Sequence, residues 1–102
     1  ENKMRKITKE IANALFARQD VNKGNTATLD GEVFLHGNKI AKIEDGALLM
    51  TLAGWNTPTT RERLNGIADV FGAKKRYSQK NWEPYLGDEA IDEDAWQHVV
   101  DV

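Results

Sequence analysis

Three glycine-containing dipeptides constrain the fold of this sequence more than any other feature. They are Asp30-Gly31, Gly37-Asn38 and Asp45-Gly46. Dipeptides of this kind adopt the positive φ angles that two-residue hairpin turns require. Each lies between short runs of β-branched and apolar residues, which are typical of strands. The pattern predicts a four-stranded antiparallel meander, with strands at residues 25–29, 32–36, 39–44 and 47–53.

Two segments have the three- and four-residue spacing of apolar side chains that is typical of amphipathic helices. The first runs from Thr8 to Arg18, and Thr8 is the expected N-cap. The second begins with Thr57 as the expected N-cap and Pro58 in the first turn, and Gly72 stands where a left-handed residue follows a helix. Both apolar stripes are expected to pack on the sheet.

Residues 74–78 and 82–86 predict a short C-terminal hairpin around residues 79–81, with Pro84 on an edge strand. The order of elements indicates an α+β fold, in which two helices pack on an antiparallel sheet made of the meander and this hairpin. We therefore expect residues 1–87 to form one domain. Residues 88–102 are expected to be an acidic C-terminal tail, either docked on the domain or mobile.

The formal charge of −2 hides an uneven distribution. From Leu86 onward there are six acidic side chains and no Lys or Arg, so the preceding part carries +4 and the tail carries −6. The near-neutral total argues against a polycation that coats nucleic acid, but it leaves room for a local basic face. Composition favours a solubilising extension for the tail, and the alternatives are that it masks basic residues or imitates phosphates.

The residues needed for catalysis are scarce. The chain has no cysteine, and Ser78 is its only serine. The absence of cysteine excludes disulfides, thiolate zinc sites and cysteine nucleophiles. His36 and His98 lie in no nucleophile or metal-ligand pattern, and His36 is expected at a strand end with its ring bonded to the following turn. We predict a protein that is not an enzyme and that needs no cofactor or metal. No apolar run is long enough to span a bilayer.

Two basic segments are candidates for contact with nucleic acid. The start of the second helix offers hydroxyls, amides and arginines to a phosphate. Residues 74–82 interleave cations with aromatic side chains that can stack on bases. The candidate nucleic-acid-binding residues are Thr57, Thr59, Thr60, Arg61, Arg63, Lys74, Lys75, Arg76 and Lys80. The alternative is that the threonines only cap the helix, Trp55 fills the core, the arginines are solvated and the hairpin lysines oppose aggregation.

Three segments resemble a family of small proteins of tailed phages and prophages. They are Met4-Arg5-Lys6-Ile7-Thr8, the strand-turn-strand from Leu35 to Ala41, and the helix start from Gly54 to Asn65. The acidic tail lies outside the resemblance. The resemblance implies a phage origin and the host cytoplasm as the location, and it implies no mechanism.

Two functions remain open. The first is a phage accessory protein that binds a host or phage protein, for example as an inhibitor or modulator of a host system. Its expected interface residues are Tyr77, Trp82, Trp96 and Val99, because aromatic side chains often anchor protein interfaces. The second is a nucleic-acid-binding protein that uses the basic residues of the second helix and the hairpin.

Overall fold

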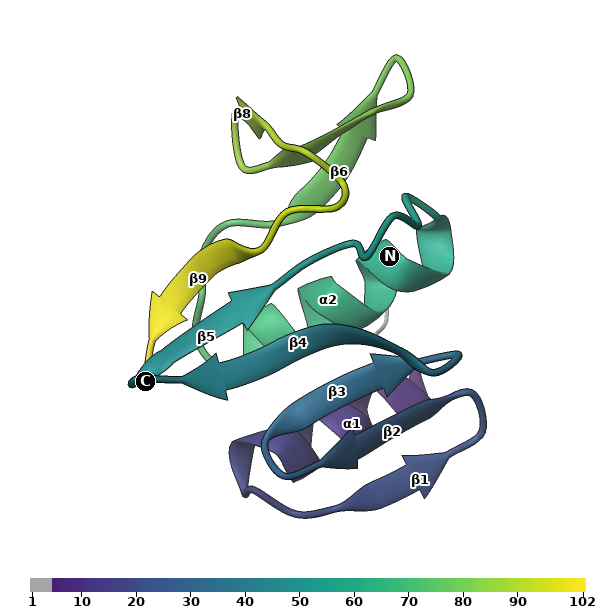
Figure 1. Cartoon of the computed structure of the whole chain (residues 1–102), viewed down its shortest axis with the longest axis vertical. Helices are drawn as coiled ribbons and strands as arrows, with labels where there is room; N and C mark the ends of the chain where they lie inside the picture. The colour runs from purple at the N-terminus through teal and green to yellow at the C-terminus, as the bar shows by residue number, and fades with distance from the viewer. Residues whose placement is uncertain (1–4) are drawn as a thin grey trace.

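The computed structural model describes residues 5–102, which form two helices and two antiparallel sheets (Figure 1). This is the predicted α+β class. Met4, the first residue of the three resembling segments, lies outside the described residues. The elements are α1 (Lys6–Phe16), β1 (Val21–Lys23), β2 (Thr26–Leu29), β3 (Glu32–Leu35), β4 (Asn38–Glu44), β5 (Ala47–Met50), α2 (Pro58–Val70), β6 (Tyr77–Lys80), β7 (Glu83–Leu86), β8 (Glu89–Ala90) and β9 (Gln97–Asp101).

The predicted meander is present as β2 to β5, and the short strand β1 extends it at one edge. The turns at Asp30-Gly31 and Asp45-Gly46 have the expected positive φ angles. The middle turn is His36-Gly37 rather than Gly37-Asn38, because Leu35 pairs directly with Asn38. His36 is therefore a turn residue with a φ of 52°, and its backbone N–H donates to the carbonyl of Asn25 over 2.8 Å.

Both helices lie on the same face of the larger sheet, with α1 behind β2 and β3 and α2 behind β4 and β5 (Figure 1). The core forms between the helices and this face, because the apolar stripes of both helices meet the inward side chains of the strands. Its fully buried apolar side chains include Ile11, Leu15, Val33, Ile40, Leu48, Met50, Leu52, Leu64 and Ile67.

The second helix begins and ends as predicted. The Thr57 hydroxyl accepts a hydrogen bond from the Thr60 N–H over 3.2 Å, and Gly72 follows the helix with a φ of 78°. The predicted cap of the first helix is wrong. The N-cap is Arg5, and Thr8 lies buried inside α1, where its hydroxyl bonds to side chains of α2 instead of to its own first turn.

The segment after Leu86 contributes strands to both sheets. Ala90 pairs with Tyr85 in the smaller sheet, and Val100 pairs with Leu48 in the larger one. Figure 1 shows β9 running beside β5, with the C-terminus at this edge. The expectation of a plain solubilising extension is therefore corrected for residues 97–101. Val99 and Val100 are half-buried and pack against the core. The predominantly acidic composition of this segment did not indicate that it has an apolar surface.

The smaller sheet is the predicted hairpin with a shifted turn. Its two-residue turn is Asn81-Trp82 rather than residues 79–81, and both residues have positive φ angles of 52° and 70°. Asn65 anchors the sheet to α2, since its amide bonds both the N–H (2.6 Å) and the carbonyl (3.0 Å) of Tyr77. The Tyr77 hydroxyl also donates to Gln97 over 2.9 Å, which connects the hairpin to the start of β9.

Candidate functional site

All three tryptophans of the chain are exposed, with exposed fractions of 58% for Trp55, 86% for Trp82 and 39% for Trp96. Tryptophan is on average a highly buried residue, so exposed copies are informative. Trp55 lies in the loop before α2, and Trp82 lies at the tip of the β6–β7 hairpin. Grouped exposure of large aromatic side chains marks a candidate binding surface.

Asn56 joins the loops that carry Trp55 and Trp82. Its Nδ2 donates long hydrogen bonds to the carbonyl of Trp82 (3.5 Å) and to Oε1 of Gln79 (3.4 Å). Arg61 holds Asn56 in place, because its Nη1 donates to both the backbone carbonyl (3.2 Å) and Oδ1 of Asn56. We call Trp55, Asn56, Arg61, Gln79 and Trp82 the two-tryptophan surface.

The backbone of Trp82 adopts a conformation that disfavours a large side chain. It is the second of two consecutive left-handed residues in a tight hairpin turn, a position where glycine is usual. For an L-residue other than glycine this conformation costs roughly 1–2 kcal/mol. Strain of this kind clusters at functional positions, and the exposed indole of Trp82 gains little packing in return.

A pocket of about 380 Å³ lies beside Trp55, between the β3–β4 turn and the start of α2. Its lining residues are Leu35, His36, Asn38, Ile40, Leu52, Trp55, Thr57, Thr59 and Thr60. None of them is an acidic residue, lysine or arginine. The volume lies within the range of about 300–1,000 Å³ that is typical of small-molecule sites. All lining residues except Leu52 come from the second and third resembling segments, so the fold brings these segments together.

The threonines of the predicted phosphate site differ in their accessibility. Thr60 is buried, and its hydroxyl lies 2.9 Å from the Thr57 hydroxyl, which also caps the helix. Both hydroxyls are therefore engaged within the protein. Thr59 is half-buried at the pocket and has no side-chain hydrogen bond within residues 5–102. The predicted bond from the His36 ring to its turn is likewise missing from this part of the chain, because His36 lies in the turn and its ring is exposed.

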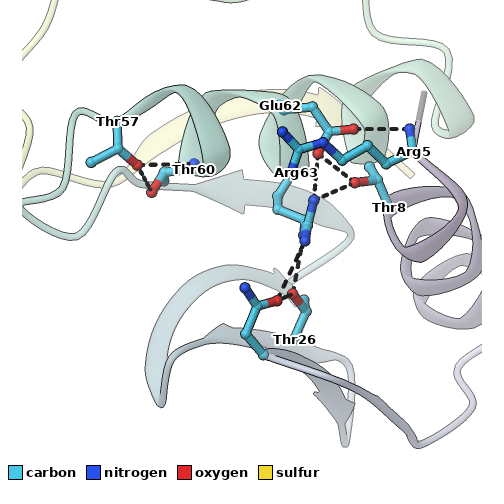
Figure 2. A network of polar contacts seen from close by, with 8 residues as sticks. Arg5, Thr8, Thr26, Thr57, Thr60, Glu62 and Arg63 are labelled. Atoms are coloured by element: carbon cyan, nitrogen blue, oxygen red, sulfur yellow. Dashed lines mark hydrogen bonds and ion pairs between the residues drawn. The ribbon is translucent and has the colours of Figure 1, made fainter. Parts of the chain in front are cut away.

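Arg63 does not belong to a nucleic-acid surface, because its side chain is only 2% exposed. Its Nε donates to the Thr26 hydroxyl over 3.0 Å. Its Nη1 donates to the Thr8 hydroxyl over 2.8 Å and forms an ion pair with Glu62, as Figure 2 shows. A phosphate could reach this guanidinium only if the network between the helices and β2 opened.

The remaining predicted cations have different surroundings, and one of them has a carboxylate partner. Arg76 forms an ion pair of 2.6 Å with Asp69, and both residues line a shallow hollow of about 540 Å³ that also contains Arg61 and Glu62. Lys75 lies against Gly87, the residue before Asp88 and Glu89. Lys80 pairs in register with Glu83, and its ammonium group lies 5.7 Å from the ring centroid of Tyr85. Lys74 is exposed.

The four predicted interface residues have different environments. Tyr77 is only 3% exposed, so it cannot serve as an interface residue. Its burial raises the pKa of the phenol well above the ordinary value. Val99 is half-buried in β9. Trp96 is exposed, and the Lys42 ammonium lies 4.5 Å from its ring centroid. Trp82 is 86% exposed, so its indole is accessible to a binding partner.

Sequence reasoning placed Trp55 in the core, and the structure corrects this. The two residues before it, Ala53 and Gly54, have φ angles of 54° and 81°, so the chain turns outward at the end of the apolar strand. The Gly54 N–H also donates to the carbonyl of Glu93 over 2.8 Å, which fixes the loop. The glycine directly before Trp55 was the signal that could have placed this side chain outside.

Residues 5–102 contain neither a metal-binding cluster nor a membrane-spanning helix. No group of three or more His, Cys, Asp or Glu residues is placed to hold a metal ion. In the same residues, neither helix has the length and apolar character needed to cross a membrane.

The fold and this surface define a small α+β domain that presents aromatic side chains on two connected loops beside a pocket without acidic residues, lysine or arginine. The model of the protein family described as "Kyanoviridae Gp96 protein" matches residues 4–101. This range includes the acidic tail as far as Asp101, so the expectation that the tail lies outside the resemblance is wrong. The chain therefore belongs to the Kyanoviridae Gp96 family and is a phage protein. Searches of the curated proteins and of the solved structures gave no match.

Proposed function

We propose that this phage protein is a non-enzymatic accessory protein that acts in the host cytoplasm by binding a host or phage protein. The binding site is the two-tryptophan surface together with the adjoining pocket. The observation that carries the proposal is the exposure of Trp55 and Trp82 on loops that Asn56 ties together. Inhibition or modulation of a host system is the expected consequence of such binding.

Aromatic side chains on a supported surface suit protein recognition. Tryptophan is enriched among the few residues that dominate interface energetics, and truncating such a residue typically costs about 2 kcal/mol or more. A loop whose backbone is already ordered loses less entropy on binding. Asn56 bonds to the backbone carbonyl of Trp82, which helps to order the two loops before binding.

The charge distribution supports a protein partner over nucleic acid. Arg63 is buried and Arg76 is paired with Asp69. Arg61, Lys74, Lys75 and Lys80 are the four predicted cations that remain for phosphate contacts, and Glu83 lies opposite Lys80 in the hairpin. An affinity that depends on many phosphate contacts needs a more uniform basic face.

The proposal is tested by affinity capture from nuclease-treated lysate of infected host cells. The baits are the wild type, the double variant Trp55→Ala/Trp82→Ala and the control variant Trp96→Ala. We expect one specific protein to be enriched by the wild type and the control, and its recovery to fall at least tenfold with the double variant. Equal recovery with the double variant would overturn the proposal.

A second measurement addresses nucleic acid directly. Fluorescence anisotropy with random duplex and single-stranded DNA at about 50 and 200 mM salt is expected to show no micromolar binding, because phosphate-driven affinity should be strongest at the lower salt. Micromolar binding that weakens by orders of magnitude between these conditions would favour the nucleic-acid function instead.

A further inference from the structure

We infer that the pocket beside Trp55 receives an uncharged aromatic side chain of the partner protein. The inference rests on the proposed function and specifies the chemistry of the residue that the partner inserts. It is carried by the apolar base of the pocket, its volume and the absence of acidic residues, lysine and arginine from its lining.

The base of the pocket is apolar. Leu35, Ile40 and Leu52 line it and are at most 5% exposed, so the atoms that they present to the pocket belong to the protein core. The Trp55 indole adds an aromatic wall at the side. Aromatic rings bury a large area for few rotatable bonds, and pairs of rings gain further from edge-to-face or offset contacts. The volume of about 380 Å³ accommodates a ring system of this kind.

The lining disfavours a cationic occupant, because it contains no acidic residue. A lysine or arginine side chain that entered the pocket would lose water without gaining an opposite charge, which is unfavourable. The lining also contains no lysine or arginine that could pair with a carboxylate. An uncharged ring meets no such penalty.

The polar groups at the pocket fit the polar end of a tyrosine or tryptophan. Asn38 offers an amide that can donate or accept, and Thr59 offers a hydroxyl. In the first turn of α2, the amides of Thr60 and Arg61 bond to Thr57, whereas the Thr59 amide has no partner within the described part of the chain. Buried Tyr and Trp side chains usually find one hydrogen-bond partner, which these groups provide.

The first test measures amide chemical shifts of the ¹⁵N-labelled full chain. The probes are N-acetyl-L-tyrosine amide, N-acetyl-L-leucine amide and N-acetyl-L-lysine amide at millimolar concentration. We expect the tyrosine probe to shift the signals of His36, Asn38, Thr59 and Thr60 at least threefold more than either other probe. Equal shifts with the lysine probe, or no shifts at these residues, would overturn the inference.

The second test fills the pocket from its mouth. Asn38→Trp places a bulky ring at an exposed lining position, and Asn22→Trp is the matched control on an exposed position of β1 outside the pocket. We expect Asn38→Trp to abolish the probe shifts and to reduce partner recovery at least tenfold, whereas the control retains both. Thr59→Tyr serves the same purpose if circular dichroism shows that Asn38→Trp fails to fold.

The outcomes separate the inference from the proposed function. If the folded pocket-filling variant still captures the partner and the double tryptophan variant does not, the inference fails and the proposed function stands. If both variants capture the partner, the proposed function fails. Sedimentation velocity tests another occupant: a dimer that is lost in Trp82→Ala would mean that Trp82 of a second copy fills the pocket, and this would overturn the inference.

Discussion

Arg63 in α2 donates a hydrogen bond to the hydroxyl of Thr8 in α1 over 2.8 Å, although the two residues are 55 positions apart. The same guanidinium group donates to Thr26 in β2 over 3.0 Å and pairs with Glu62 (Figure 2). One buried side chain therefore connects both helices to the larger sheet. Because Arg63 carries a charge in the interior, its partners must all be present for the arrangement to be stable.

The substitution Arg63→Met is expected to lower the free energy of unfolding by about 3 kcal/mol, since it removes the charged donor of the Thr8 and Thr26 hydroxyls and the ion pair of Glu62. Glu62 then keeps only the hydrogen bonds from the Thr8 hydroxyl and the Arg5 N–H. Urea denaturation followed by circular dichroism measures this loss. Arg76→Met is the control, because the pair of Arg76 with Asp69 is exposed and such pairs contribute under about 1 kcal/mol. Similar losses in the two variants would contradict a structural role specific to Arg63.

The parts of the fold that the sequence predicted correctly depend on local signals. The dipeptides Asp30-Gly31 and Asp45-Gly46 need only their own backbone preferences to specify turns. The cap at Thr57 and the glycine at 72 act in the same way at the ends of α2. Such signals specify where strands and helices begin and end without information from distant residues.

The parts that the sequence did not reveal depend on contacts between distant residues. The sequence does not distinguish Arg61 from Arg63. In the structure Arg63 is the buried one, because Thr8 and Thr26 approach it and accept its hydrogen bonds. The pairing of β9 with β5 joins residues about fifty positions apart, and the acidic composition of the tail gave no local sign of it. For the candidate site, the sequence indicated Trp82, but it misplaced Trp55 and could not show the pocket.

Tyr77 makes the stability of the protein depend on pH at the alkaline end. Burial raises the pKa of its phenol, so the folded chain keeps Tyr77 protonated where the unfolded chain ionises, above a pH of about 10. The contribution of Tyr77 to the free energy of unfolding is complete below that pH. It is lost as the pH rises toward the pKa that Tyr77 has in the folded chain. We expect the free energy of unfolding to fall above pH 10 by up to about 1.4 kcal/mol per pH unit from this group alone.

The comparison with Tyr77→Phe isolates this effect. The variant loses the hydrogen bond to Gln97 and is expected to be about 1 kcal/mol less stable at neutral pH. Above pH 10 its stability should decrease less steeply than that of the wild type, so the difference between the two proteins narrows. Urea denaturation between pH 7 and about 11.5, roughly 1.5 units above the ordinary tyrosine pKa, measures both slopes. Parallel slopes would refute the role of Tyr77.

Val100 opposite Leu48 is the contact that is expected to hold β9 on the sheet. Val100→Asp places a carboxylate beside a fully buried leucine, and we expect the free energy of unfolding to fall by about 2 kcal/mol. Hydrogen–deuterium exchange should show faster exchange in β5 and β9 and unchanged protection in β2 and β3. Val102→Asp is the control, because Val102 is exposed and its substitution should change stability by less than about 0.5 kcal/mol. Unchanged exchange in β5 would contradict the pairing.

Trp82→Gly is expected to improve stability and to abolish binding. Glycine adopts the φ of 70° at this turn position without strain, and Asn-Gly is a favoured sequence for such turns, so the melting temperature should rise by an amount equivalent to about 0.5–1 kcal/mol. Recovery of the partner should fall at least tenfold because the exposed indole is lost. Asn81→Gly changes the neighbouring turn residue, keeps the indole and should preserve capture. A lower melting temperature in Trp82→Gly would mean that the indole stabilises the fold, and the strained turn would then need no functional explanation.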